Sequence, residues 1–171
     1  MINDSLFSSE TPEHYTPKRI VDLVIGTLGG IDLDPCSNPG GSPIIPAGSH
    51  FTPVENGLTR TWFGRVYLNP PYGRVIGSWV GKLVSEFRAG NVHSAIALVP
   101  ARVDTAWFGE LYGFPVCFVR GRLRFLDRER KPQGSAPFPS AIVYMGTEFE
   151  RFRSEFGSLG NIYIPGGSWA N

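Results

Sequence analysis

Apolar residues near the start of the chain repeat at helical spacing and then give way to a short extended run. Residues 16–28 place apolar side chains every three or four positions, which predicts a helix that Thr16-Pro17 opens and Gly29-Gly30 ends. The next four residues, 31–34, predict a short strand. The segment 36–53 is rich in Pro, Gly and Ser, so we expect mostly loop there, with one short strand near Ile44.

The rest of the chain alternates apolar runs with amphipathic segments. Continuous apolar runs predict buried strands at 66–68, 94–99 and 116–119. Helical spacing predicts helices over 76–87, from an Asp104 cap to Leu111, and over 149–156. Two further runs, 123–125 and 141–145, predict an antiparallel hairpin near the C-terminus.

This alternation of strands and helices is typical of an α/β fold. We expect a single domain over residues 1–171, with residues 1–14 as a loosely ordered lead-in. The expected architecture is a mostly parallel twisted sheet with helices on both faces. The antiparallel hairpin would complete one side of that sheet.

Composition excludes several classes of protein. Of the 171 residues, 42% are hydrophobic and 18% are charged, which excludes a disordered chain. From the polar, acidic N-terminal stretch we expect no signal peptide, and no apolar run approaches the roughly 20 residues of a membrane helix. Two cysteines, Cys36 and Cys117, form no disulfide framework, so we expect a reduced, cytoplasmic setting. The cysteines and the three histidines show no metal-ligand spacing, so we expect no metal.

A net charge of +1 hides an uneven distribution along the chain. Residues 60–131 carry twelve Lys or Arg against five Asp or Glu, and six of the twelve fall within 120–131. A local basic surface of this kind attracts phosphate backbones. A solvated hairpin of mixed charge accounts for the same pattern equally well.

The most informative motif is Asn69-Pro70-Pro71-Tyr72, directly after the strand at 66–68. In an open α/β sheet, ligands bind at the carboxyl ends of the strands, where this loop lies. The Asn69 side-chain oxygen and the Pro70 carbonyl oxygen can both accept from one planar NH₂ group, and an aromatic ring two residues later can stack on a heterocycle. The motif is therefore suited to alkylation of an exocyclic amine. A Pro-rich turn with a packing tyrosine is the ordinary alternative.

A second candidate site follows the first strand, at residues 32–38. A carboxylate at a strand end, followed by a tight turn, can hold a charged or hydroxylated cofactor, although Asp-Pro is also a common turn. The segment has no Gly-rich phosphate loop, so a nucleotide phosphate is not indicated. A nucleophilic cysteine that methylates a ring carbon would lie in a Pro-Cys loop, but Pro35-Cys36 stands in the wrong place for it, beside this candidate cofactor site, so Cys36 is expected to be a small packing residue.

Together these motifs resemble the phage-type DNA adenine methyltransferases, the Dam family, over roughly residues 15–145. The landmarks appear in one order: Tyr15-Thr16-Pro17, Leu33 to Ser37, Glu55 to Leu58 followed by Trp62, Asn69 to Tyr72, Ala97 to Ala101, Gly121 to Phe125, and Ala136 to Ser140. The resemblance implies a Rossmann-like methyltransferase domain that uses S-adenosylmethionine and acts on double-stranded DNA. It implies direct in-line transfer of a methyl group to N6 of a flipped adenine.

The resemblance also implies roles for individual residues. The acceptor amine would be bound by Asn69 and Pro70, followed by Pro71, with Tyr72 stacked on the base. Phe138 would pack on the other side of the base, or would be an ordinary core residue, and Arg122 and Arg124 would contact DNA phosphates. The residues implied at the cofactor are Thr16, Pro17, Asp34, Pro35 and Cys36, with Glu55 or Asn56 at its adenine. A surface turn is the alternative for the last two.

The chain departs from the family pattern at the expected cofactor site. Residues 42–51 contain no acidic residue to bind the cofactor ribose, so Asp32 or Asn38 is expected to substitute for it. Residues 37–40 replace the usual Gly-rich end of the cofactor loop. There is also no evident separate target-recognition domain, which predicts a short or relaxed target sequence.

Several functions fit these residues besides methylation of adenine. The same chemistry could act on a cytosine amine, an RNA base or a protein glutamine, and the basic segment 120–131 favours nucleic acid over protein. A nucleic-acid-binding protein without catalytic activity is a further alternative. The family resemblance suggests a bacterial or phage-infected host cytoplasm, in a phage or restriction-modification setting.

Overall fold

Seven strands form one mixed sheet in the computed structural model, which describes residues 14–38 and 43–166. The expected lead-in therefore lies outside the described residues, except for His14. The strands are β1 (Ile31–Asp34), β2 (Ala47–His50), β3 (Gly64–Leu68), β4 (Val92–Pro100), β5 (Val116–Val119), β6 (Ser140–Met145) and β7 (Gly160–Tyr163). The helices are α1 (Lys18–Leu28), α2 (Ile76–Arg88), α3 (Ala106–Gly109) and α4 (Phe149–Phe156), with one 3₁₀ turn at Gly57–Thr59.

The sheet has a parallel half and an antiparallel half. The strand order is β2-β1-β3-β4-β6-β5-β7. Strands β2, β1, β3 and β4 are parallel neighbours, whereas the pairs β4–β6, β6–β5 and β5–β7 are antiparallel. Five of the seven strands consequently run in one direction, and only β6 and β7 run in the other. The carboxyl ends of β1 and β3 meet at one edge of the parallel half.

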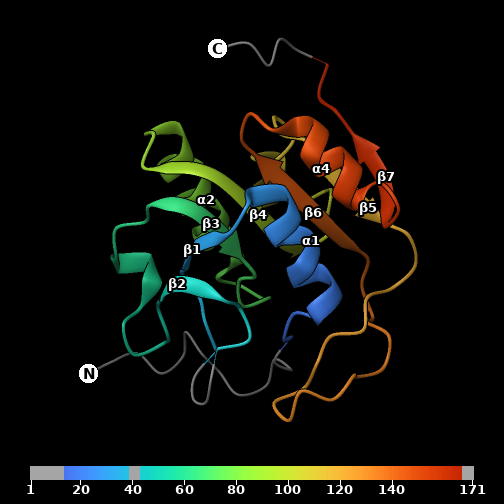
Figure 1. Ribbon diagram of the computed structural model, residues 1–171, viewed down its shortest axis with the longest axis horizontal. Coiled ribbons are helices and arrows are strands. Elements are labelled where there is room, and N and C mark those ends of the chain that lie inside the picture. The colour runs from blue at the N-terminus through green and yellow to red at the C-terminus, as the bar shows by residue number, and fades with distance from the viewer. Residues whose placement is uncertain (1–13, 39–42, 167–171) are drawn as a thin grey trace.

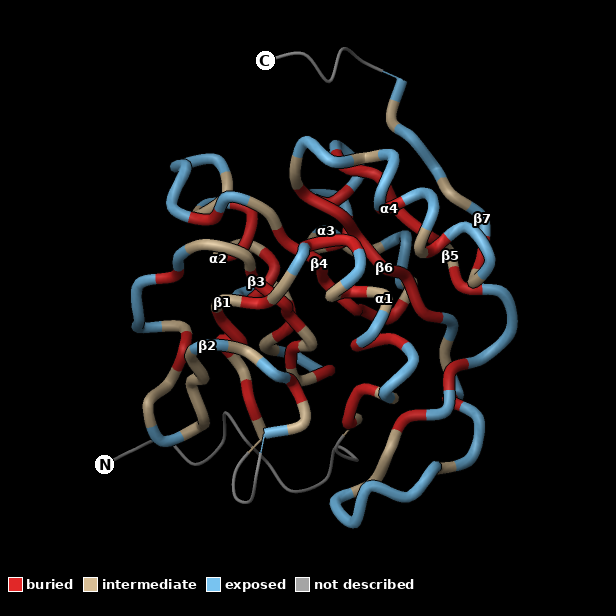
Figure 2. The backbone as a smooth tube through the Cα atoms, in the orientation of Figure 1, coloured by how far each residue is buried: buried red, intermediate tan, exposed pale blue. Residues whose placement is uncertain are grey.

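Helices cover both faces of the sheet, as the sequence predicted. Helices α1 and α4 contact each other in front of the sheet in the view of Figure 1, and α2 and α3 contact each other behind it. This confirms a mixed α/β domain. The buried residues concentrate in the central strands, drawn red in Figure 2, and all six residues of β6 are buried.

Most predicted elements are confirmed, but two helix starts were wrong. Helix α1 begins at Lys18 with Pro17 as its N-cap, and no side chain caps it. The hydroxyl of Thr16 instead lies 2.8 Å from the Tyr67 hydroxyl, so Thr16 joins the helix to β3. Helix α3 is capped by Thr105, whose Oγ1 accepts from the Phe108 amide at 3.4 Å, and Asp104 takes no part in the cap.

The strand predictions were wrong at three places. The second strand, β2, spans residues 47–50 and not the region of Ile44. Residues 123–125 form no strand, because no residue of that segment pairs with the sheet, and the next residue, Leu126, makes only isolated bridges to Tyr15 and Pro132. The antiparallel partners of β6 are β4 and β5. Strand β7 was not predicted, since its residues are mostly exposed at the edge of the sheet.

None of the helices in the part of the chain that the structure describes is both long enough and apolar enough to cross a membrane.

Candidate active site

A pocket opens where the carboxyl ends of β1 and β3 meet. It is lined by Tyr15, Thr16, Asp34, Cys36, Ser37, Asn38, Pro43, Ile44, Ile45, Tyr67 and Asn69. Four segments of the chain meet here: the segment before α1, the turn after β1, residues 43–45 before β2, and the end of β3 with the loop after it. Four predicted site residues that are far apart in the sequence therefore share one pocket: Thr16, Asp34, Cys36 and Asn69.

The Asn69 side chain is held in one orientation. Its Nδ2 donates to the main-chain carbonyl of His14 at 2.7 Å and to Thr16 Oγ1 at 3.2 Å. Because both neighbours of Nδ2 accept hydrogen bonds, the amide oxygen Oδ1 must point the other way, where Tyr72 donates to it at 3.1 Å. A carbonyl oxygen has two lone pairs, so Oδ1 keeps one for an incoming N–H donor.

Tyr72 is buried, with 8% of its surface exposed. Its hydroxyl lies 3.1 Å from Asn69 Oδ1 and 3.2 Å from the Leu98 carbonyl of β4, so one hydrogen is shared between two acceptors. Burial raises the pKa of this hydroxyl well above its usual value, which keeps it protonated as a donor. The loop after β3 is thereby fastened to β4.

Three rings surround Tyr72 beside the pocket. Phe138 meets it edge-on, with centroids 5.3 Å apart and planes at 81°. His14 lies 5.1 Å from Tyr72, and Phe125 lies 4.9 Å from His14. Phe138 is half-buried, and the main chain beyond it pairs with the segment after β4, where the Ala101 amide donates to Pro139 at 2.8 Å. The predicted pair Tyr72 and Phe138 thus lies in one aromatic cluster with His14 and Phe125.

Asp34 is a buried carboxyl at the end of β1, with 4% of its surface exposed. Its hydrogen bonds are few: the Cys36 amide lies 3.3 Å from Oδ1, and the Ser37 side chain also contacts it. Burial raises the pKa of Asp34 to about 6, against the opposing effects of the Cys36 amide and of His50. The pocket therefore contains a carboxylate that a cationic ligand group would stabilise.

Cys36 is bound to the loop after β3. Its Sγ donates to the main-chain carbonyl of Asn69 at 3.0 Å. Burial raises the pKa of the thiol, and the nearby Asp34 raises it further, so the reactive thiolate is disfavoured. This agrees with a packing role for Cys36.

Glu55 and Asn56 lie outside the pocket lining. Glu55 accepts from the amide and the hydroxyl of Thr52, and Asn56 has a positive φ of 51° before the 3₁₀ turn. Gly57 packs so closely on the turn after β1 that a Cβ there would overlap the carbonyl oxygen of Pro35. Pro17 and Pro35 do not line the pocket either, so these four residues remain predictions as cofactor contacts.

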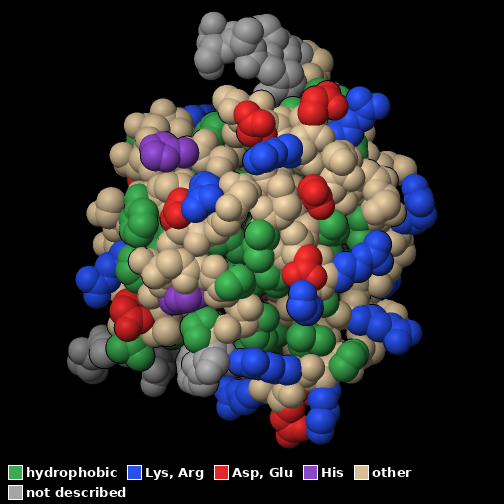
Figure 3. Space-filling model, viewed as in Figure 1, with side chains coloured by type: hydrophobic (Ala, Val, Ile, Leu, Met, Phe, Trp, Pro, Cys, Tyr) green, Lys and Arg blue, Asp and Glu red, His purple; other side chains and the backbone are tan. Residues whose placement is uncertain are grey.

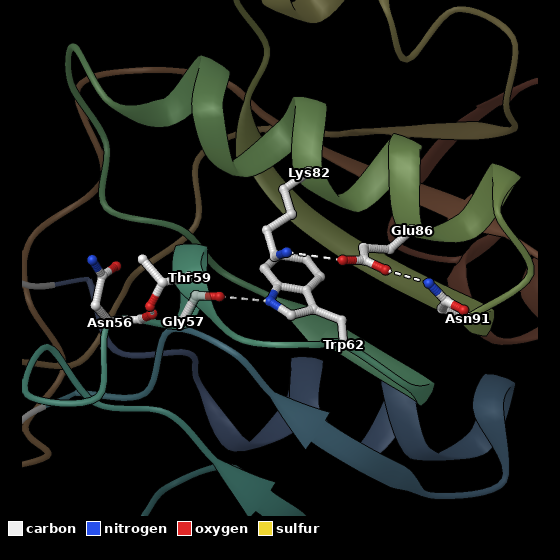
Figure 4. Close-up of polar contacts among 7 residues, drawn as sticks. All are labelled: Asn56, Gly57, Thr59, Trp62, Lys82, Glu86 and Asn91. Carbon is white, nitrogen blue, oxygen red and sulfur yellow. Dashed lines mark hydrogen bonds and ion pairs between the residues drawn. The ribbon is translucent and has the colours of Figure 1, made fainter.

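A tryptophan supports the loop that contains Glu55 and Asn56 (Figure 4). The buried Trp62 donates from Nε1 to the Gly57 carbonyl at 2.8 Å. Lys82 of α2 lies over the Trp62 ring at 5.5 Å and pairs with Glu86 at 2.8 Å. The loop between β2 and β3 is thus braced against α2.

Of the two candidates for the cofactor ribose, only Asn38 lines the pocket. Asp32 lies toward the amino end of β1, where Arg65 binds both of its carboxylate oxygens, at 2.9 and 2.8 Å. The Arg65 side chain lowers the pKa of Asp32 to about 2. Asp32 is consequently engaged in an ion pair away from the site.

Arg122 and Arg124 are exposed, whereas Leu123 and Phe125 between and after them are buried. Neither arginine has an ion-pair partner among the residues that the structure describes. In Figure 3, Lys and Arg side chains gather at the lower right, where Figure 1 draws this segment in orange. Phe125 points into the aromatic cluster, so the basic segment borders the candidate site.

Sequence reasoning missed His14, Phe125 and Tyr67 as parts of the site. The alternation of exposed arginines with Leu123 and Phe125 was a signal for one inward face, but it was assigned to a strand. For His14 the sequence contained no comparable signal. Among residues 14–38 and 43–166, no group of His, Cys, Asp or Glu could hold a metal ion.

Comparison with known proteins identifies the family of this chain. No curated protein and no solved structure is similar to this chain at a significant level. The family model for DNA N-6-adenine-methyltransferase (Dam) matches residues 6–163, which include the pocket, the loop after β3 and the basic segment. The chain therefore belongs to the Dam family of DNA N-6-adenine methyltransferases.

Proposed function

We propose that this protein transfers a methyl group from S-adenosylmethionine to N6 of an adenine that has been flipped out of double-stranded DNA. The observation that carries the proposal is the fixed Asn69 amide. Its Nδ2 is held by His14 and Thr16, so Oδ1 is presented beside Tyr72 at the edge of the pocket. Membership of the Dam family supports adenine in DNA as the acceptor.

The acceptor amine is bound by two oxygens of the loop after β3. Asn69 Oδ1 and the Pro70 carbonyl accept its two N–H bonds, while Tyr72 stacks on one face of the base and Phe138, whose plane lies at 81° to that of Tyr72, packs against the base edge-on. Engaging both N–H bonds in the plane of the base draws the nitrogen lone pair out of conjugation. Correct placement of this nitrogen supplies much of the rate acceleration.

The pocket fits the cofactor that the family implies. Its donor set combines the buried Asp34 carboxylate, which lacks a full set of partners, with the polar side chains of Thr16, Ser37 and Asn38. A carboxylate suits the positively charged amino group of S-adenosylmethionine, and Asn38 suits a ribose hydroxyl. When bound, the cofactor would supply an activated methyl group and leave as S-adenosylhomocysteine, while the methylated amine would release one of its two protons to solvent.

Direct in-line transfer requires no nucleophile from the protein. Cys36, the one thiol beside the pocket in the described chain, donates its hydrogen to Asn69 and has a raised pKa. A covalent intermediate at Cys36 is therefore disfavoured. The residues of the protein position the acceptor amine and exclude water with the aromatic cluster. The Asp34 carboxylate stabilises the positively charged amino group of the cofactor.

Exposed arginines beside the aromatic cluster support DNA as the partner. Arg122 and Arg124 project from a segment whose buried face contacts the site, so phosphate contacts there would place a flipped base near Tyr72. Such contacts make binding strongly dependent on salt.

The test is methyl transfer from labelled S-adenosylmethionine to unmethylated duplex DNA, followed by nucleoside mass analysis. N6-methyladenine in the digest is the expected product. Methylated cytosine, RNA or glutamine would keep the chemistry and change the acceptor. If the wild-type protein binds DNA but methylates no acceptor, a DNA-binding protein without catalytic activity is the correct description.

A further inference from the structure

The imidazole of His14 lies within the aromatic cluster where the acceptor base is expected. Its centroid is 5.1 Å from Tyr72, 4.9 Å from Phe125 and 5.3 Å from Phe138. The interplanar angle with Tyr72 is 36°, so the imidazole partly covers the tyrosine face. A base that stacks on this face must take the place that His14 occupies.

The distances leave no room for a third ring in between. A base inserted between two rings needs their centroids about 7 Å apart or more, because each pair of stacked rings needs its own contact distance. The 5.1 Å between His14 and Tyr72 is well below this value. Phe138, at 5.3 Å from Tyr72, closes the cluster from another side.

The His14 imidazole is not fully hydrogen-bonded, because one of its ring nitrogens has no partner among the described residues. Nδ1 of His14 is buried and makes no hydrogen bond with the described residues. A buried polar atom without a partner costs free energy, so the ring is less stable in this place than a fully satisfied side chain would be. Burial also lowers the pKa of His14, which keeps the ring neutral and able to stack as a heterocycle.

The main chain at His14 is fixed more firmly than its side chain. The His14 carbonyl accepts from Asn69 at 2.7 Å, and Tyr15 exchanges two main-chain hydrogen bonds with Leu126, at 3.1 and 2.9 Å. The imidazole can therefore leave the cluster by rotation of the side chain while the backbone continues to hold Asn69.

We propose that His14 is a specificity-determining residue of the acceptor site, where its imidazole occupies the place of the target base until the base displaces it. This inference rests on the proposed function. An acceptor enters only if it packs on Tyr72 and Phe138 better than an imidazole does. A purine satisfies this condition, whereas the amide of a glutamine has no ring, so His14 selects nucleobases over protein amides.

The test compares wild type with His14→Ala and His14→Phe in steady-state methylation of DNA. His14→Ala removes the competing ring, so KM for DNA falls roughly three- to tenfold and kcat/KM rises. His14→Phe packs an apolar ring without an unsatisfied nitrogen, so KM rises by a similar factor. The exposed His93, changed to Ala, is the matched control and leaves both constants unchanged.

The outcomes separate this inference from the proposed function. If wild type methylates no acceptor, the proposed function fails. If wild type methylates adenine but His14→Ala lowers kcat/KM or leaves it unchanged, only the inference about His14 is overturned.

A second measurement does not depend on the variants being stable. In the NMR spectrum of the wild-type protein, the surrounding rings shift the His14 imidazole protons upfield of those of His93. Addition of S-adenosylhomocysteine and an adenine-containing oligonucleotide is expected to move them toward the position of an exposed histidine. Unchanged His14 signals, in a sample where other resonances report binding, would overturn the proposal.

Discussion

Strand β1 carries two carboxylates two residues apart, and they lie in opposite electrostatic situations. Asp32 accepts from Nε and Nη2 of the Arg65 side chain and from the Arg65 amide, and its pKa falls to about 2. Asp34 is buried with few partners, and its pKa rises to about 6. One residue separates them, so the difference comes from their surroundings and not from the strand itself.

The contrast distinguishes the two ends of the parallel half-sheet. Toward the amino end, polar groups bind one another and contribute to stability. At the carboxyl end, Asp34 and Asn69 keep unused hydrogen-bonding capacity that faces the pocket. Sites that bind ligands commonly carry such a cost in stability, and perturbed pKa values gather there.

The largest effect is expected from Asn69→Ala at the carboxyl end. Removing the amide oxygen leaves the acceptor amine with one partner, so kcat/KM for methyl transfer falls by about 100-fold or more. Initial rates with labelled cofactor measure this change. Asn91→Ala, at an exposed asparagine bound to Glu86, is the control and should retain full activity. A variant of Asn69 with near-wild-type rates would contradict the assigned role.

The next largest effect is expected from Asp34→Asn on cofactor affinity. Loss of the carboxylate removes a charge-assisted contact to a cationic ligand, so Kd for S-adenosylmethionine rises by about 10- to 100-fold. Isothermal titration calorimetry at pH 7.5 measures it. The wild-type affinity should itself weaken as pH falls through about 6, where Asp34 becomes protonated. An affinity that is equal in both proteins would place the cofactor elsewhere.

The same substitution should make the protein more stable at neutral pH. An acid whose folded pKa is raised to about 6 contributes stability below its ordinary value of 3.8 and loses it as pH rises through 6. Asp34→Asn avoids this loss, so the free energy of unfolding rises by about 3 kcal/mol at pH 8 and changes much less at pH 4. Urea denaturation at the two pH values tests the sign. A variant that is destabilised at pH 8 would show that Asp34 is structural.

The smallest effect is expected from Asp32→Asn at the amino end. Its ion pair with Arg65 is about one-third exposed on each side, so we expect a loss of only about 1 kcal/mol at pH 7, reduced further by salt. Because the pKa of Asp32 is lowered, its contribution is present above pH 3.8 and disappears as pH falls through 2. Cofactor affinity should stay the same. A clear loss of affinity would show that Asp32 also contributes to cofactor binding, which would contradict the division between a stabilising amino end and a ligand-binding carboxyl end of the parallel strands.

The sequence predicted the buried elements better than the exposed ones. Strands β3, β4 and β6 have continuous apolar runs, and α2 has a clear helical period, so hydrophobicity alone identifies them. Strand β2, with the sequence Ala-Gly-Ser-His, and the edge strand β7 are held by main-chain pairing, which leaves no apolar pattern. Residues 123–125 alternate like a strand, yet the segment does not join the sheet, and its inward Phe125 packs in the aromatic cluster beside the candidate site.

The part of the candidate site that lies within one short segment could be predicted from the sequence. Asn69 to Tyr72 follow a strand, and position after a strand is visible in the sequence. Contacts between distant segments were not predictable. His14 reaches Asn69 and Tyr72 only because the segment before α1 crosses the ends of the parallel strands, which depends on the tertiary fold.

The buried tryptophan under the loop between β2 and β3 gives this protein a fluorescence signal. Trp62 is fully buried, donates to the Gly57 carbonyl, and stacks on Trp79 with centroids 6.1 Å apart. Gly57 in turn packs directly on Pro35, the residue before Cys36 in the pocket. A ligand that shifts the turn after β1 will therefore alter the surroundings of an indole, and tryptophan emission can follow occupancy of the pocket without any label.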